Sequence, residues 1–214
     1  WGVPLKSLLL AAHLRVLSLV SSQREVLTGL VSNSRPEEAD GERVLGLFLN
    51  TLPLRVTLED ESWRALVQKV FAAERAGLPY RRYPAGRLKR AEREELFETA
   101  FNYNHFHVYQ GLEGRVEVSQ PRMFEYTNFT LMTNFDLAPG GKGLTLRLNY
   151  DSGQLAPEEV EQWAGYYLRA LETVAQDVDS PVHQAELLPE AERRTVVEVF
   201  NDTAADYDLR GTLD

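Results

Sequence analysis

The spacing of apolar residues along the chain predicts three amphipathic helices. Leucine, alanine and valine recur at steps of three and four over residues 4–21, which places them on one helical face. A second stripe spans residues 63–77, where Asp60 or Ser62 is positioned to cap the helix. The third helix begins at residue 157 and carries two glutamates in its first turn, where acidic side chains favour the helix dipole.

Alternation with a period of two predicts strands between these helices. The predicted strands span residues 25–31, 44–56, 97–109, 116–124, 129–137 and 144–150. The last two flank a Pro-Gly-Gly turn and alternate apolar with polar residues, which indicates an antiparallel hairpin with one buried face. The segment 44–56 is almost continuously apolar, which favours burial on both faces. In 97–109, aromatic residues and histidines share one face, and Asn102 and Asn104 share the other.

This order of elements predicts an α/β fold, with helices packed on a mixed, largely antiparallel sheet. The composition, 43% hydrophobic and 26% charged, is typical of globular proteins and suits one or two compact units. After residue 177 the regular pattern stops. Residues 178–214 hold only a short helical patch before a run of small and polar residues, so we predict a linker there.

Charge and composition exclude several classes of function. With 32 acidic against 23 basic residues the net charge is −9, which disfavours binding to nucleic acid or to an anionic membrane. The most basic run, 81–90, is interspersed with aromatic, proline and glycine residues and reads as a solvated loop. No apolar run reaches the roughly 18 residues of a membrane span. The lack of cysteine excludes disulfides and thiolate chemistry and fits the cytoplasm. Trp1 stands where an initiator methionine would be, so the chain reads as a fragment.

The four histidines do not predict a catalytic or metal site. His105 and His107 are two residues apart on one strand and could both reach a metal ion, but no third ligand is evident and the alternation suits a half-buried sheet face. His13 lies close to a helical stripe and His183 in the tail. No phosphate-binding glycine loop is present either. From these patterns alone we predict an α/β module with no assigned chemistry.

Several segments resemble motifs of nonribosomal peptide synthetase condensation domains. Residues 45–55, LGLFLNTLPLR, resemble the motif GxFxNTxPxR, and residues 29–36, GLVSNSRP, resemble GxxxSGRP with serine in place of the second glycine. Residues 96–103, LFETAFNY, look like the strand LFxxxFNY. At 80–84, YRRYP occupies the place of the HQDxPFE motif but lacks its leading histidine. The tail, with LLPEAERR and FNDTAADY, is similar to the segment that joins condensation and adenylation domains.

The resemblance covers essentially the whole chain and implies a chloramphenicol-acetyltransferase-like half-domain. Residues 1–177 would form the C-terminal lobe of a condensation domain, and 178–214 the linker toward an adenylation domain. The family's HHxxxDG catalytic motif does not occur in this sequence, nor does the GGxS site of a carrier protein. The resemblance therefore implies no catalytic residue here and no activity for the isolated chain.

For the parent enzyme, the resemblance implies peptide-bond formation between carrier-tethered aminoacyl and peptidyl thioesters. The reaction would take place in a tunnel between two lobes and would be a step in the biosynthesis of an antibiotic or another natural product. No cofactor would bind this chain directly, because phosphopantetheine is carried by the partner carrier proteins. The implied partners are the N-terminal lobe, peptidyl carrier proteins and the downstream adenylation domain.

Five residues are candidates for supporting the tunnel or the lobe interface. Arg35 is expected to pair with the aspartate of the absent HHxxxDG motif, because a guanidinium pairs bidentately with a carboxylate, and Arg55 is the next candidate. Asn50 either orients substrate or is a satisfied buried amide. Asn102 and Tyr103 are expected on the strand that faces the tunnel.

Two other functions stay open beside this one. The chain could belong to a free-standing CoA-dependent acyltransferase of the same fold superfamily, or it could be a non-catalytic docking module. The tail NDTAADY argues against the CoA enzyme, whereas the absence of HHxxxDG favours the docking module for the isolated chain.

Overall fold

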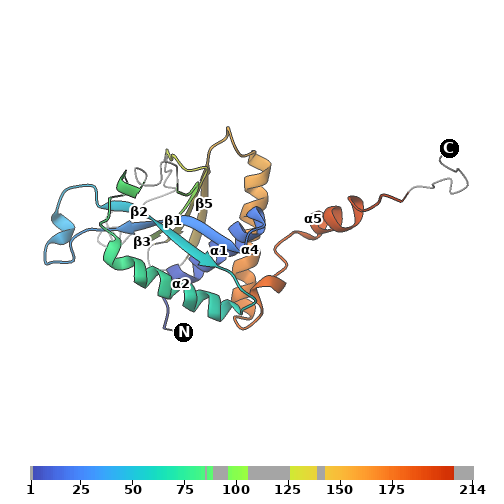
Figure 1. Cartoon of the computed structure of the whole chain (residues 1–214), viewed down its shortest axis with the longest axis horizontal. Helices are drawn as coiled ribbons and strands as arrows, with labels where there is room; N and C mark the ends of the chain where they lie inside the picture. The colour runs from blue at the N-terminus through green and yellow to red at the C-terminus, as the bar shows by residue number, and fades with distance from the viewer. Residues whose placement is uncertain (1, 85, 89–95, 106–125, 139–142, 205–214) are drawn as a thin grey trace, which may run out of the picture.

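The described part of the chain folds as a layer of helices on one side of a five-stranded sheet (Figure 1). The computed structural model describes residues 2–84, 86–88, 96–105, 126–138 and 143–204. Within these residues, no helix combines the length and the apolar character that a membrane crossing needs.

The three predicted helices are confirmed as α1 (Leu5–Ser21), α2 (Trp63–Gly77) and α4 (Pro157–Gln176). Ser62 caps α2, because its hydroxyl accepts a hydrogen bond of 3.3 Å from the backbone nitrogen of Ala65. Helix α1 packs between α2 and α4 and contacts the centre of the sheet. Short helical turns complete the chain at η1 (Gly41–Arg43), η2 (Leu78–Tyr80), η5 (Val182–Gln184), α5 (Glu190–Arg194) and η6 (Thr195–Val199).

The described strands are β1 (Glu25–Asn33), β2 (Leu49–Thr57), β3 (Thr99–His105), β4 (Leu131–Leu137) and β5 (Leu144–Tyr150). Their order in the sheet is β2-β1-β3-β4-β5. The pairs β1/β2 and β4/β5 are antiparallel, which confirms the predicted hairpin, whereas β1/β3 and β3/β4 are parallel. The sheet is mixed as predicted, and its parallel share among these strands is larger than the sequence suggested.

Strand β2 differs from the prediction for residues 44–56. It begins only at Leu49, and the apolar residues before it are exposed, with Leu45 at 97% and Leu47 at 88%. Within β2, Leu54 and Val56 are buried whereas their neighbours are exposed. Burial on both faces was therefore wrong, because β2 is an edge strand that packs on α2 with one face only. The predicted strand 116–124 and residues 106–109 lie outside the described residues.

The core fills the space between the helices and the sheet, and its largest fully buried side chains include Trp63, Phe101, Phe135 and Tyr167. His13 lies among them and is fully buried.

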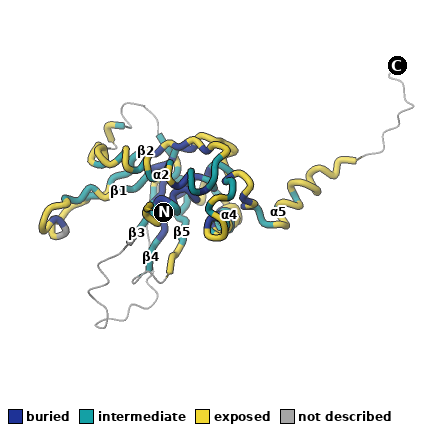
Figure 2. Tube along the Cα trace, turned by 90° about the horizontal axis from the view of Figure 1, so that it is seen from below, coloured by how far each residue is buried: buried dark blue, intermediate teal, exposed yellow. Residues whose placement is uncertain are grey.

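The chain continues to pack on this body beyond Asp177, within the segment predicted as a linker. Arg64 of α2 binds Asp179 through two hydrogen bonds of 2.7 and 2.9 Å, and Val182 and Leu187 are buried. The described residues after Leu187 extend away from the body and are mostly exposed (Figure 2). Part of the segment predicted as a linker therefore packs on the body.

Candidate functional site

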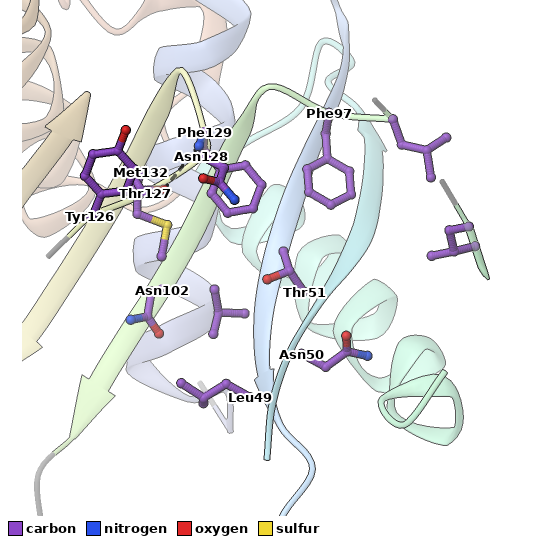
Figure 3. A pocket seen from close by; sticks show the side chains of 13 residues that line it. Leu49, Asn50, Thr51, Phe97, Asn102, Tyr126, Thr127, Asn128, Phe129 and Met132 are labelled. Atoms are coloured by element: carbon purple, nitrogen blue, oxygen red, sulfur yellow. Dashed lines mark hydrogen bonds between the residues drawn. The ribbon is translucent and has the colours of Figure 1, made fainter. Parts of the chain in front are cut away.

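A pocket of about 450 Å³ opens on the sheet face opposite the helices (Figure 3). Its lining residues are Val31, Leu49, Asn50, Thr51, Leu88, Leu96, Phe97, Asn102, Tyr126, Thr127, Asn128, Phe129 and Met132. Most of these side chains are apolar or aromatic, with a few amides and hydroxyls among them, a composition typical of a small-molecule site.

Gly29 shapes one wall of this pocket. A Cβ atom at Gly29 would collide with the ring of Phe97 and would lie 2.7 Å from the methyl carbon of Thr51. The missing side chain therefore allows the aromatic ring to lie directly against β1, where it closes the pocket.

Strand alternation brings Asn102 to the pocket. Its neighbour Phe101 points into the core, where its ring centroid lies 5.4 Å from that of His13. Asn102 and Asn104 consequently lie on the opposite face, as the period-two pattern predicted. Tyr103, by contrast, points to the helical side and packs against the core, and partial burial raises the pKa of its hydroxyl.

A row of hydrogen-bonded polar side chains extends from Asn102 across three strands, and we call it the polar ladder. It consists of Asn102 and Asn104 on β3, Asn134 and Asp136 on β4, and Arg147 and Asn149 on β5. The sheet register places Asn102 beside Asn134, Asn104 beside Asp136 and Arg147 beside Asn134.

The bonds within the polar ladder are short and specific. The Nδ2 atom of Asn102 donates to Oδ1 of Asn104 at 3.2 Å and to Oδ1 of Asn134 at 3.0 Å. Asn104 donates to Asp136 at 2.7 Å, and Asn134 donates to Asn149 at 3.1 Å. The carboxylate of Asp136 also lies 3.4 Å from the guanidinium of Arg147.

The ladder residues on β4 and β5 are not among the site residues that the sequence predicts. Their signal was present in the hairpin, where polar positions alternate with apolar ones, but the pattern could not show that this polar face adjoins β3.

Asn50 contributes to the pocket wall, yet its amide is engaged elsewhere. Its Nδ2 atom donates to the carbonyl oxygens of Arg81 at 3.0 Å and of Tyr83 at 2.7 Å. The side chain therefore ties β2 to the segment that follows α2.

The two candidate arginines lie away from the pocket. Nη1 of Arg35 donates to the carbonyl oxygens of Gly41 at 3.2 Å and Val44 at 2.6 Å, and its guanidinium lies 4.6 Å from the ring centroid of Phe48. Arg55 forms an exposed ion pair of 3.3 Å with Glu25. Two of the five predicted residues, Asn50 and Asn102, line the pocket. The other three, Arg35, Arg55 and Tyr103, lie elsewhere.

The chemistry available at this site is that of binding and orientation. Among the residues that the structure describes, no three His, Cys, Asp or Glu side chains are grouped to hold a metal ion. The polar groups on the pocket side of the sheet are mainly amides, which donate and accept hydrogen bonds but do not titrate. The site can therefore hold and align a polar ligand.

Known proteins with similar sequences are named synthetases and synthases. The AMB antimetabolite synthetase AmbE of Pseudomonas aeruginosa is 37% identical over 206 residues, which cover 94% of this chain and 9% of AmbE. Bacitracin synthase 1 of Bacillus licheniformis is 27% identical over 214 residues, which cover 96% of this chain and 4% of that protein. The chain thus spans a small part of these relatives.

Solved structures agree in fold. The starter condensation domain of the rhizomide synthetase RzmA superposes with a TM-score of 0.68 at 22% identity, over 88% of this chain and 47% of that domain. A four-domain nonribosomal peptide synthetase bound to AMP and glycine gives a TM-score of 0.76 at 14% identity, over 90% of this chain and 16% of the other. These matches confirm the chloramphenicol-acetyltransferase-like fold. The profile of the condensation domain matches residues 1–197, and the chain therefore belongs to the condensation-domain family of nonribosomal peptide synthetases.

Proposed function

We propose that this chain is the C-terminal lobe of a condensation domain that joins carrier-tethered aminoacyl and peptidyl thioesters. The observation that carries the proposal is the pocket on the sheet face opposite α1, α2 and α4, beside the polar ladder. The similarity to about half of a solved condensation domain, 47% of its length, supports the view that a second lobe faces this surface.

The proposed reaction is attack of an acceptor amine on a donor thioester, which forms an amide and releases the thiol of the donor arm. Alignment of amine and thioester, together with a polar environment for the tetrahedral oxyanion, can supply much of the acceleration. This lobe contributes alignment, and the N-terminal lobe contributes the histidine motif. Both substrates reach the tunnel on phosphopantetheine arms of carrier proteins, so the chain itself holds no cofactor.

The loop before β2 is the proposed contact with the N-terminal lobe. Leu45 and Leu47 are 97% and 88% exposed. The described part of the chain therefore does not cover these two apolar side chains. Covering them stabilises a complex, because burial of apolar surface contributes about 25 cal/mol per Å². The same loop carries Arg35, whose guanidinium we propose also meets the aspartate of the histidine motif.

Reconstitution tests the proposed function. The chain, alone or joined to the N-terminal lobe, is mixed with carrier proteins loaded with donor and acceptor, and amide product is measured by mass spectrometry. We expect product only when both lobes are present. Product from the chain alone would contradict the assignment of catalysis to the other lobe, and no product from the joined lobes would contradict the proposed reaction.

The role of Arg35 is tested separately in the joined lobes. Replacing it with alanine should lower the condensation rate, and Arg35→Lys should restore little, because an ammonium reproduces neither the forked hydrogen bonds nor the stacking on Phe48. The matched control is Arg24→Ala, which removes only an exposed ion pair with Asp60. An Arg35→Ala protein with the control's stability and rate would refute the role.

A further inference from the structure

We infer that the pocket is built to receive an N–H group, which donates a hydrogen bond to the side-chain oxygen of Asn102. The inference rests on the proposed function for the source of that group, but the orientation of Asn102 follows from the polar ladder alone.

The direction of the hydrogen bonds begins at Asp136. A carboxylate only accepts hydrogen bonds, so the group of Asn104 that lies 2.7 Å from it must be the amide nitrogen. The oxygen of Asn104 then faces Asn102 and can only accept. Asn102 must therefore present its own nitrogen to Asn104, at 3.2 Å. The ion pair with Arg147 holds the carboxylate of Asp136, from which this series of hydrogen bonds starts, in place.

Asn134 completes the constraint on Asn102. It is fully buried between β3 and β5, its nitrogen donates to Asn149, and its oxygen lies 3.0 Å from the nitrogen of Asn102. If the amide of Asn102 were reversed, its oxygen would face two other oxygens at hydrogen-bond distance. Both N–H groups of Asn102 are thus used within the ladder.

Only the oxygen of Asn102 remains to meet a ligand. No described residue donates a hydrogen bond to it, and Asn102 is among the residues that line the pocket (Figure 3). A carbonyl oxygen held in one orientation attracts a hydrogen-bond donor and repels an oxygen that carries no proton, so the pocket favours donors such as N–H groups over carbonyl or carboxylate oxygens.

Two parts of the proposed substrates carry such a group. One is the amine of the acceptor aminoacyl thioester, and the other is an amide N–H of a phosphopantetheine arm. The chemistry that Asn102 recognises is the same in both, and matched probes separate the two sources.

The orientation is tested without any ligand. In the ¹⁵N-labelled chain, both side-chain N–H protons of Asn102 should be protected from exchange and show contacts to Asn104 and Asn134. Asp136→Asn, which keeps shape but can also donate, should reduce that protection, and Asn104→Leu is a second variant that removes one acceptor. The matched control is Thr145→Val, which changes an exposed residue of the same sheet face outside the ladder. Unprotected N–H protons in the unaltered chain would overturn the inference.

Recognition is tested by chemical-shift titration with two pairs of probes. The first pair is pantetheine and its analogue with both amides N-methylated, and the second is leucine ethyl ester and the analogue with methoxy in place of the amine. We expect one N–H probe to bind about fivefold more tightly than its partner, the effect of one neutral hydrogen bond. Asn102→Leu should abolish that preference, Asp136→Asn should reduce it, and Thr145→Val should keep it.

The pair that shows the preference identifies the source of the N–H group. Equal affinity within both pairs, a preference for the N-methylated or methoxy probe, or no binding by any probe would overturn the inference. Failure of the proposed function would look different, since the preference for an N–H probe would persist while the joined lobes formed no amide from loaded carrier proteins.

Discussion

A hydrogen-bond network around His13 connects four elements of the core, α1, α4, β1 and β4. Its Nδ1 atom lies 2.7 Å from the hydroxyl of Tyr167 on α4, and its Nε2 atom lies 3.1 Å from Oγ1 of Thr28 on β1. The hydroxyl of Tyr167 is in turn 3.1 Å from Oγ1 of Thr133 on β4. Burial lowers the pKa of His13 from 6.5 to about 3, because the protonated ring would lose its hydration.

This burial predicts acid sensitivity. The pKa of His13 is lower in the folded than in the unfolded chain, so the unfolded state takes up protons first as the pH falls. The stability is fully present above about 6.5 and is lost progressively toward pH 3. Between about pH 7.5 and about pH 5 this group alone should lower the free energy of unfolding by about 2 kcal/mol. Urea titrations at both pH values measure the change.

The control for this prediction is His13→Gln, which keeps a polar side chain but does not titrate in this range. Its free energy of unfolding should be lower at neutral pH, with a shallower dependence on pH. An identical pH dependence in both proteins would assign the acid sensitivity to other groups.

Removing the hydroxyl of Tyr167 should destabilise the same network. Tyr167→Phe leaves Nδ1 of His13 and Oγ1 of Thr133 without their hydrogen bonds to this hydroxyl, which costs about 1–3 kcal/mol. The comparison is Tyr103→Phe, which removes a half-buried hydroxyl that makes no hydrogen bond to the described residues. Chemical unfolding should show a loss of less than about 0.5 kcal/mol for that control. Equal losses would mean that the network contributes nothing beyond packing.

At the scale of elements, much of this chain could be predicted from its sequence. The helices follow from steps of three and four, and Ser62 is one of the two caps, with Asp60, that the sequence offers before the stripe of α2. The two faces of β3 follow from alternation. Periodicity assigns a face to each residue but does not name the neighbouring strand, so it left the parallel pairing of β3 with β4, and with it the polar ladder, unpredicted.

The apolar run before β2 shows a second limit of sequence patterns. Hydrophobicity alone cannot distinguish a strand buried within this chain from a loop whose partner surface belongs to another segment. β1 pairs with β2 only as far as Asn33 and Leu49, so the residues before Leu49 are not part of the sheet.

The exposed leucines of this loop provide a test at the scale of elements. Replacing Leu45 and Leu47 with aspartate should change the free energy of unfolding of this chain by less than about 0.5 kcal/mol, because both side chains are exposed. The same variant should weaken binding to the separately expressed N-terminal lobe, as measured by calorimetry. Leu168→Asp is the matched control, since this leucine is 57% exposed on α4. Unchanged binding by the loop variant would contradict its proposed contact.

At the scale of the whole molecule, the segment after α4 belongs to the compact body. Pro181 pairs with Ser62 in an isolated β-bridge, and the backbone nitrogen of Val182 donates to the backbone carbonyl oxygen of Glu61 at 2.9 Å. Leu187 is buried. The segment thus braces the start of α2. The later tail makes fewer contacts, among them the hydrogen bond of 2.5 Å from Tyr166 to Glu192.

Two truncations measure this boundary. A chain that ends at Gln176 loses the burial of Val182 and Leu187, about 1.5–3 kcal/mol for each side chain, and the ion pair of Arg64. A chain that ends at Pro189 retains these contacts, so its thermal midpoint should lie close to that of the full chain. If the chain that ends at Gln176 had the same thermal midpoint as the full chain, the residues after 177 would not contribute to the stability of the body.

The mixed topology of the sheet has a consequence for the order in which the chain assembles. The outer pairs β1/β2 and β4/β5 join strands that are consecutive in sequence, so each closes a short loop. Strand β3 joins them through parallel pairings, and the hydrogen bond that the Thr28 hydroxyl donates to the carbonyl oxygen of Thr99 closes a separation of 71 residues. Contacts of such high sequence separation slow the folding of a domain. The sheet should therefore assemble from its two edges inward, and the pocket beside Asn102 would be among the last features to form.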